Sequence, residues 1–297
     1  MLTLDLEDKI KYTLVKKITD DTFEVDHLHE YILSIQVGPS VFRFCVIDSV
    51  RNRCLQIEDY KFNYPLDPNQ ILEQLDLVFD DHTLLKAGFW RSIKLSVKNL
   101  KFSLIPNSLF SDQYTADFLR LNCDFTENEE VHYFKHGSND TVNIFVAEKK
   151  IINWFKAQYP NKTIEVIHHT SLLIEGVLQN YSSSEKQKVY VSIEDSIVTI
   201  VVKKGFNLEF CNNFQFRTAN DFVYFVMFVF DELDLNPEVI PVILLGDISK
   251  NSESFNKIYR YIRNVSFGDK PVTLKFGYKF DEINDHHYFD LYNMHLC

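Results

Sequence analysis

The sequence predicts an α/β protein made of two similar lobes, each a mixed sheet with flanking helices. Three observations predict this fold class. Segments typical of strands and of helices alternate along the 297-residue chain, which is long enough for two domains. One order of elements, three strands followed by a helix, a strand and a helix, occurs twice. The repeat is also visible in the letters, because LSIQ at 33–36 matches VSIE at 191–194.

The first lobe begins with three predicted strands joined by tight turns. They lie at 31–36, 41–47 and 53–60, and β-branched and aromatic residues are frequent in them. A helix should follow, because Asp67 can cap its first turn and Pro68 suits its first position. An inserted segment is predicted near 93–135, with strands at 93–97 and 101–105 and a short helix at 116–119.

A segment of alternating strands and helices is predicted to link the two lobes. Strands at 141–147 and 163–168 alternate in it with helices at 148–159 and 170–181, and a predicted strand at 131–135 precedes it. The residues after it, SSSEK at 182–186, are small or charged, as is typical of a linker. We therefore predict one lobe over residues 1–182 and a second over 183–297.

The second lobe repeats the opening pattern. Thr218 and Asp221 have the spacing of a capping box at the start of a helix. The run at 222–230 is apolar on all sides, which predicts a buried helix rather than a groove for a partner. The predicted elements are strands at 188–193, 196–202, 206–216, 239–245 and 272–280 and helices at 218–235 and 252–264.

The composition excludes several classes of function. The chain is acidic, with 31 Lys and Arg against 42 Asp and Glu, so nucleic acid is not an expected partner. No two of its eight glycines lie closer than nine positions, which excludes the clustered glycines of common phosphate-binding loops. The first residues, MLTLDLED, lack the basic start of a secretory signal, and the longest apolar run is too short for a membrane span. We expect a cytoplasmic protein without a membrane span.

Side chains that could bind metals or act as nucleophiles are scattered. The five cysteines are an odd number without a CxxC pair, which indicates reduced, packed thiols. His27 and His29 would share one face of a strand, as two metal ligands can, but no third ligand is identifiable. We predict no metal site; an acidic metal-dependent hydrolase stays open as an alternative.

The repeated element order, together with the linking segment at 141–181, resembles the actin-like ATPase fold, whose lobes are ribonuclease-H-like. The letters VNIFVAEKKII at 142–152 are similar to the corresponding part of actin-like proteins of pilus assembly and type II secretion. The whole chain, including HYFDL at 287–291, most resembles an uncharacterised family of Bacteroidetes proteins assigned that fold. No activity is known for that family, so the resemblance implies a fold and no reaction.

The resemblance also implies where ATP and Mg²⁺ would bind, at one turn in each lobe and at a later glycine turn. The aspartate that would orient Mg²⁺ falls on Gln36, a neutral amide, and Pro39 has no N–H for a phosphate. Two carboxylates at 194–195 would repel a triphosphate. The positions that match the binding turns are Gly38 and Ser40, then Asp195 and Ser196, then Gly246.

These departures predict a catalytically silent actin-like module, a pseudo-ATPase that acts as a protein-interaction or scaffold component. Its partner would be an unknown protein or a second copy of the chain. No catalytic residue is assigned and no cofactor is expected. The alternative is a nucleotide-binding actin-like ATPase with unusual phosphate turns, because Gly38, Ser40 and Gly246 remain compatible with bound ATP and Mg²⁺.

Overall fold

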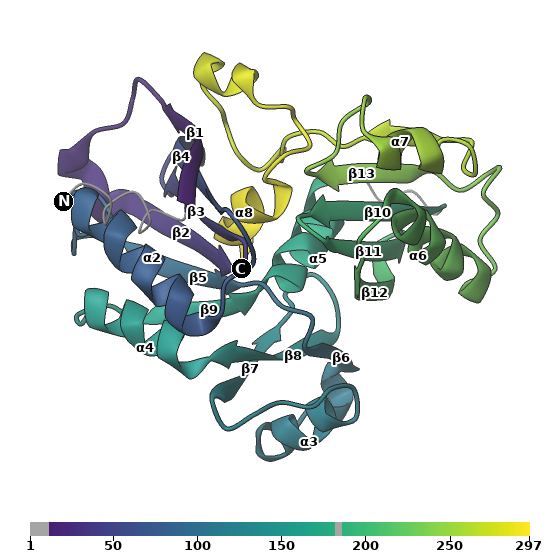
Figure 1. Ribbon diagram of the computed structural model, residues 1–297, viewed down its shortest axis with the longest axis horizontal. Helices are drawn as coiled ribbons and strands as arrows, with labels where there is room; N and C mark the ends of the chain where they lie inside the picture. Colours follow the sequence, from purple (N-terminus) through teal and green to yellow (C-terminus); the bar gives the residue numbers. More distant parts are fainter. Residues whose placement is uncertain (1–11, 182–185) are drawn as a thin grey trace, which may run out of the picture. The chain divides into compact units, whose positions relative to one another are not determined.

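The structure is a computed structural model that describes residues 12–181 and 186–297 (Figure 1). Contacts divide the chain into two compact units. The described residues of unit 1 are 12–135, 141–169 and 274–280, and those of unit 2 are 136–140, 170–181, 186–273 and 281–297. Most of the predicted linker lies outside the described residues, and the lobe boundary after residue 182 stays a prediction.

Unit 1 contains a six-stranded mixed sheet in the order β1-β4-β3-β2-β5-β9. The first four strands of that order pair antiparallel, whereas β2, β5 and β9 run parallel. All the strands of this sheet were predicted except β1. Their bounds are β1 (Tyr12–Thr19), β2 (Tyr31–Gly38), β3 (Val41–Asp48), β4 (Arg53–Phe62), β5 (Ser92–Val97) and β9 (Ile164–His168).

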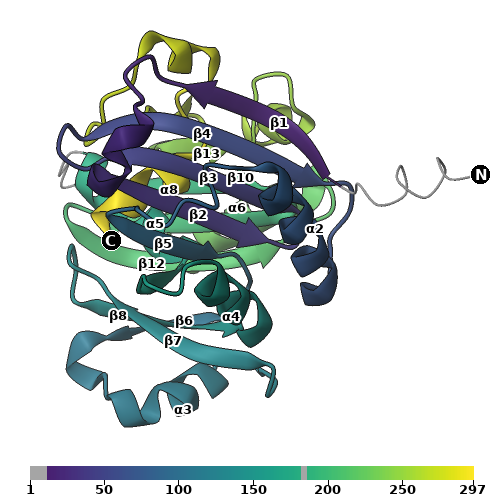
Figure 2. The same ribbon diagram turned by 90° about the vertical axis from the view of Figure 1, so that its left-hand side faces the viewer.

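Two helices, α2 (Pro68–Asp81) and α4 (Lys149–Gln158), cover one face of this sheet, as Figures 1 and 2 show. The predicted start of α2 is confirmed, because the Asp67 side chain accepts the N–H groups of Asn69 and Gln70 in a capping box. Phe79 of α2 is buried and lies 6.1 Å from the ring of Phe42 in β3. Apolar burial of this kind is what holds a short helix on a sheet.

Strands β6 and β7 of the predicted inserted segment form a separate three-stranded antiparallel sheet with β8, which comes from the predicted linking segment, in the order β6-β8-β7. The short helix α3 (Thr115–Arg120) packs on it around buried Leu119, and Figure 2 shows helix and sheet together. The strands predicted at 93–97 and 101–105 are both present, but they belong to different sheets. The bounds are β6 (Phe102–Pro106), β7 (Glu129–Lys135) and β8 (Thr141–Glu148).

Unit 2 contains a five-stranded sheet in the order β12-β11-β10-β13-β14. The order matches β4-β3-β2-β5-β9 of unit 1, with the same antiparallel and parallel pairings, so the predicted duplication is confirmed. The bounds are β10 (Gln187–Glu194), β11 (Ile197–Lys204), β12 (Asn207–Gln215), β13 (Val242–Gly246) and β14 (Val265–Phe267), with helices α5 (His169–Asn180), α6 (Ala219–Glu232) and α7 (Glu253–Ile258).

Two predictions near the C-terminus are corrected by the structure. The helix predicted at 252–264 is present but ends at Ile258, and the strand predicted at 272–280 is wrong because it does not form. Only one isolated bridge, between Arg53 and Lys275, joins this stretch to a sheet strand. At Gly277 the backbone passes so close to Asp20 that a Cβ would lie 1.9 Å from its carboxylate, and Asp20 is held by Arg53 at 2.9 Å. The path of residues 272–280 is therefore set by this close contact and not by the hydrogen bonds of a β-strand.

Candidate functional site

The first predicted phosphate turn lies in unit 1, at the end of β2. Gly38 pairs with Val41, so the turn itself is only Pro39 and Ser40. Both carbonyls of that turn are used inside the unit, since Pro39 accepts the N–H of Leu66 at 2.8 Å and Ser40 accepts that of Phe62 at 2.9 Å. The turn is therefore braced against the start of α2, and Pro39 supplies no N–H to a ligand.

A pocket of about 210 Å³ lies beside this turn. It sits at the carboxyl ends of the parallel strands β2 and β5, where open α/β sheets bind ligands. A Cβ on Gly38 would lie 3.2 Å from Cβ of Lys98, so glycine allows β5 to approach the turn closely. Its lining combines apolar Val37, Leu66, Ile71, Val97 and Ile151 with polar Lys98, Asn99, Glu129 and Glu148.

The polar lining of this pocket is largely engaged. Glu129 forms an ion pair with Lys101 at 2.8 Å, and the Asn99 side chain donates to the carbonyl of Val146 at 2.8 Å. Burial, and then the nearby Glu129 carboxylate, raise the pKa of Glu148. Two carboxylates at the pocket make it a poor cradle for a triphosphate. Sequence reasoning missed these four polar residues, although Lys98 and Asn99 directly follow a predicted strand.

Gln36 is the residue at which the resemblance to actin-like ATPases predicted an aspartate. It is fully buried in β2 and lies opposite Arg43 of β3 in the register. The carboxylate next in that register, Asp59 of β4, accepts a hydrogen bond from Arg43 Nε at 2.8 Å. Asp59, the nearest acid in the sheet register, is thus paired with Arg43. Gln36 itself offers only a neutral amide, which is a weak ligand for Mg²⁺.

The second predicted turn, Asp195 and Ser196, joins β10 to β11 in unit 2. Asp195 has φ +55°, in the left-handed region that Asp and Asn tolerate better than other residues with a side chain. The carbonyl of Ser196 accepts the N–H of Phe216 at 2.8 Å. The left-handed backbone conformation therefore accounts for an aspartate at position 195 without any ligand.

This assignment gives a direct test at Asp195. We expect Asp195→Asn to leave the free energy of unfolding nearly unchanged, and Asp195→Val to lower it by about 1–2 kcal/mol, because a β-branched residue is strained at this φ. Urea unfolding followed by far-UV circular dichroism measures both changes. Equal stability of the two variants would contradict a backbone role.

The third predicted position, Gly246, ends β13 with φ +79°. A Cβ there would lie 2.2 Å from the carbonyl oxygen of Ile193 in the neighbouring strand β10. The N–H of Gly246 donates to the carbonyl of His286 at 2.8 Å, and that of Asp247 donates to Ile193 at 2.6 Å. Two N–H groups that could have faced a ligand are thus satisfied by the chain itself.

The C-terminal segment of unit 2 supplies the first of these acceptors, the carbonyl of His286, and packs closely on the rest of the unit. The His286 ring donates through Nε2 to the carbonyl of Ile248 at 2.7 Å and lies 4.5 Å from the ring of Phe267. Its short helix α8 (Phe289–Asn293) packs on α5, where a Cβ on Gly176 would come within 2.8 Å of Phe289. The segment therefore covers the end of β13 as an integral part of unit 2.

The structure thus brings together three of the five predicted site residues. Asp195, Ser196 and Gly246 lie at one edge of the unit 2 sheet, because Ile193 and Gly246 are register partners. Gly38 and Ser40 lie at the corresponding edge of the unit 1 sheet, where the carboxyl ends of β2 and β5 meet. Their assignment to nucleotide binding stays a prediction.

Within the described residues no group of three or more His, Cys, Asp or Glu side chains could hold a metal ion. His27 and His29 lie in a short 3₁₀ helix, Val25–Glu30, and not on a strand, so the predicted strand geometry is wrong. Their rings stack with centroids 6.0 Å apart. None of the five cysteines is in a disulfide, in line with reduced thiols.

Comparison with protein families decides the affiliation of the chain. Residues 20–265 match a family described as "Protein of unknown function (DUF3822)". The chain belongs to this family. No curated protein matches the chain.

Two solved structures show the fold of this DUF3822 protein. One is a Bacteroides thetaiotaomicron protein with an actin-like ATPase fold and unknown function, at 20% identity and TM-score 0.76, over 93% of this chain and 99% of that one. The other is a PilM–PilN type IV pilus biogenesis complex, at 12% identity and TM-score 0.53, over 89% of this chain and 97% of that one. The fold is the actin-like ATPase fold. In the described part of the chain no helix has the length and apolarity to cross a membrane.

Proposed function

We propose that this DUF3822 protein is a catalytically silent actin-like module that acts by binding a protein partner or a second copy of itself. The observation that carries the proposal is the use of the Gly246 and Asp247 N–H groups by the carbonyls of His286 and Ile193. Phosphate binding in such turns depends on backbone N–H groups that remain available to the ligand. A turn whose donors are satisfied internally has little to offer a nucleotide.

The first turn supports the same proposal. Gln36 and Pro39 replace a carboxylate and an N–H donor, and Glu129 and Glu148 line the adjacent pocket. That pocket, at about 210 Å³, is below the usual range for small-molecule and cofactor sites. Protein interaction is a function the fold can serve without nucleotide chemistry, and one of the similar structures was solved as a PilM–PilN complex. The compartment of the protein stays a prediction.

A second candidate function is nucleotide binding with unusual phosphate turns. Gly38 and Ser40 favour it, since both remain at the turn, and Lys98 lines the pocket beside them. A lysine next to a glycine turn could neutralise part of a phosphate charge. The two candidates differ in whether purified protein binds ATP.

We expect isothermal titration of the full chain with ATP or ADP, with and without Mg²⁺, to give no saturable heat at ligand concentrations of about 1 mM, which corresponds to less than about 4 kcal/mol of binding. A malachite-green assay should likewise detect no phosphate release. Saturable, Mg²⁺-dependent heat would favour nucleotide binding over the silent module if Lys98→Met abolished it. The surface control Lys86→Met should then retain that heat.

A further inference from the structure

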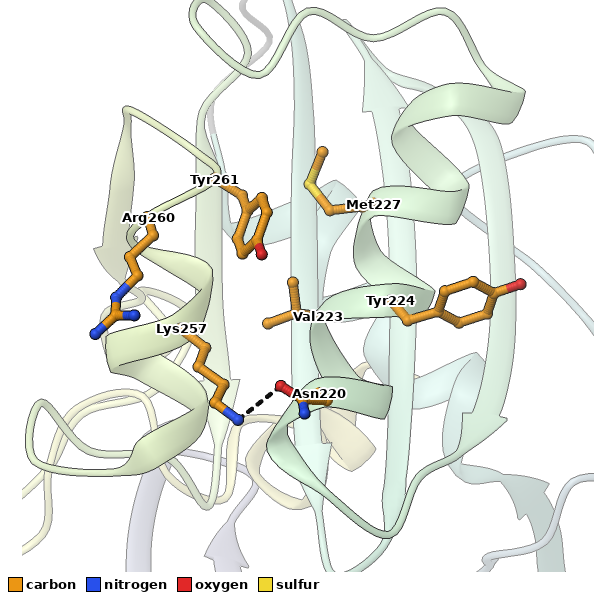
Figure 3. A pocket seen from close by; sticks show the side chains of 7 residues that line it. All are labelled: Asn220, Val223, Tyr224, Met227, Lys257, Arg260 and Tyr261. Atoms are coloured by element: carbon orange, nitrogen blue, oxygen red, sulfur yellow. Dashed lines mark hydrogen bonds between the residues drawn. The ribbon is translucent and has the colours of Figure 1, made fainter.

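A second hollow, with a volume of about 410 Å³, lies between α6 and α7 in unit 2. We call it the α6–α7 groove. Figure 3 shows Val223 and Met227 of α6 at its floor and Tyr261, from the turn after α7, facing them. One end is closed by Lys257, which donates to Asn220 at 2.6 Å. The groove thus has an apolar floor and a polar, cationic end.

Exposed aromatic rings lie at the α6–α7 groove and on the outer face of α6 beside it. Tyr224 is 63% exposed and Tyr261 56% exposed. The ring of Tyr224 stacks on that of Phe228, one helical turn along α6, with centroids 6.3 Å apart. The solvent side of an amphipathic helix is normally polar. The run at 222–230 was predicted to be buried on all sides, which is wrong for Tyr224 and Phe228, so the outer face of α6 remains apolar and uncovered in unit 2.

The α7 side of the groove is basic, whereas α6 carries the acids Asp221, Asp231 and Glu232 and no cation. Between residues 250 and 263 there are four cations, Lys250, Lys257, Arg260 and Arg263, and one anion, Glu253, in a chain of net charge −11. Glu253 pairs with Lys257 at 2.7 Å, and Glu238 pairs with Arg263 at 3.3 Å. Arg260 is exposed at the outer rim and forms no ion pair with any residue that the structure describes. A positive rim beside an apolar floor is thus left for a ligand.

We propose that the α6–α7 groove binds an acidic segment of a partner protein. A bulky apolar side chain of that segment would lie against Val223 and Met227, while a neighbouring carboxylate pairs with Arg260. Helix-lined grooves recognise partners in this way, with apolar anchors for affinity and charges for orientation. Exposed tyrosine and arginine are the residue types that most often dominate such interfaces. The inference rests on the proposed interaction function and names the surface that performs it.

A peptide fits this surface better than nucleic acid does. The floor of the groove is formed by an aliphatic and a thioether side chain, which offer nothing to a sugar–phosphate backbone. Of the two cations that line the groove, Lys257 is already paired with Glu253. A polyanion needs several unpaired cations along its path. One available arginine suits a single carboxylate.

The test is selection of short random peptides displayed on phage against the full chain, followed by fluorescence anisotropy with the enriched peptides. We expect enriched sequences to combine acidic residues with a bulky apolar residue. Their affinity should fall by at least about tenfold in Arg260→Glu and in Tyr261→Ala, both substitutions of exposed side chains. The matched controls Arg91→Glu and Tyr278→Ala, exposed residues that lie in unit 1, should bind like the unchanged protein.

Three results would overturn the inference: no enriched peptide, enriched peptides that are neutral or basic, or acidic peptides that bind equally to the two groove variants. A single-stranded oligonucleotide that binds more tightly than the peptides and depends on Arg260 would overturn it as well. Failure here is distinguishable from failure of the proposed function, because that function is contradicted by Mg²⁺-dependent ATP binding and not by an empty groove.

Discussion

Replacement of Gly246 by alanine is expected to lower the free energy of unfolding of unit 2 by at least about 3 kcal/mol, a sum of backbone strain and steric overlap. The new Cβ would stand 2.2 Å from the carbonyl oxygen of Ile193 at φ +79°, so β13 and β10 must separate. Their separation also breaks the Asp247 bond to Ile193 and displaces the His286 carbonyl from Gly246. Urea unfolding followed by far-UV circular dichroism measures the loss.

The matched control is Gly205→Ala. Gly205 also has positive φ, at +61°, but no atom lies within 4 Å of its would-be Cβ. Only the conformational cost of about 1 kcal/mol should appear there. If the two alanine variants lose equal stability, the close approach to Ile193 does not matter and the account of Gly246 is wrong.

Removal of the Glu58 carboxylate is expected to lower the free energy of unfolding of unit 1 by about 3 kcal/mol, the usual cost of deleting one partner of a buried charged cluster. Glu58 is fully buried on the helix-covered face of the sheet. In Glu58→Ala four donors would lose their acceptor, although the Lys17 ammonium is exposed and can turn to water. These donors are Lys17 Nζ at 2.8 Å, Gln56 Nε2 at 2.6 Å, His82 Nε2 at 3.0 Å and the hydroxyl of Tyr60.

The pH dependence of stability gives this prediction a second signature. Burial acts to raise the pKa of Glu58, but hydrogen bonds from His82, Lys17 and Tyr60 outweigh it and lower the pKa to about 2. In the unfolded chain the pKa returns to its ordinary value of 4.5. The carboxylate therefore contributes stability in full above that value, and the contribution is lost as the pH falls toward 2. In Glu58→Gln the free energy of unfolding should therefore depend less on pH in this acidic range.

Tryptophan fluorescence can follow the loss in unit 1 selectively. The two tryptophans, Trp90 and Trp154, both belong to unit 1, and Trp154 contacts Phe79 of α2 at 4.7 Å between ring centroids. The control is Asp80→Asn, which removes an exposed ion pair with Lys86 and should cost less than about 0.5 kcal/mol. If Glu58→Gln loses stability at acidic pH as steeply as the unchanged protein does, other carboxylates cause the pH dependence.

Local signals in the sequence predicted most of the fold. The start of α2 was predictable because its cap, Asp67, and its first residue, Pro68, act within one helical turn. Strand β1 was missed because it is an edge strand with mostly exposed side chains, so its sequence shows little apolar alternation. The stretch at 272–280 has the letters of a strand, yet its path is set by the contact of Gly277 with Asp20, which lies over 250 positions earlier. No local pattern encodes such a contact.

The candidate site likewise combines features that local sequence encodes with features that depend on tertiary packing. Turn chemistry is local, so the sequence could identify Asp195 as a turn residue and Gly38 and Gly246 as the ends of strands that lead into turns. The acceptor of the Gly246 N–H is His286, far along the chain, and the exposure of Tyr224 depends on what packs against α6. Both follow from tertiary packing, which residue patterns in one sequence do not specify.

The interleaving of the two units has a practical consequence for dissecting the protein. Residues 136–140 belong to unit 2 although they interrupt unit 1, and 274–280 return to unit 1 after most of unit 2 is complete. A cut between 181 and 186 would deprive one half of the Lys275 bridge to Arg53 and the other half of α5, whose Asn180 side chain donates to that of Asn293 at 2.7 Å. Neither half should be obtained intact by simple truncation, whereas two co-expressed halves would be expected to reassemble.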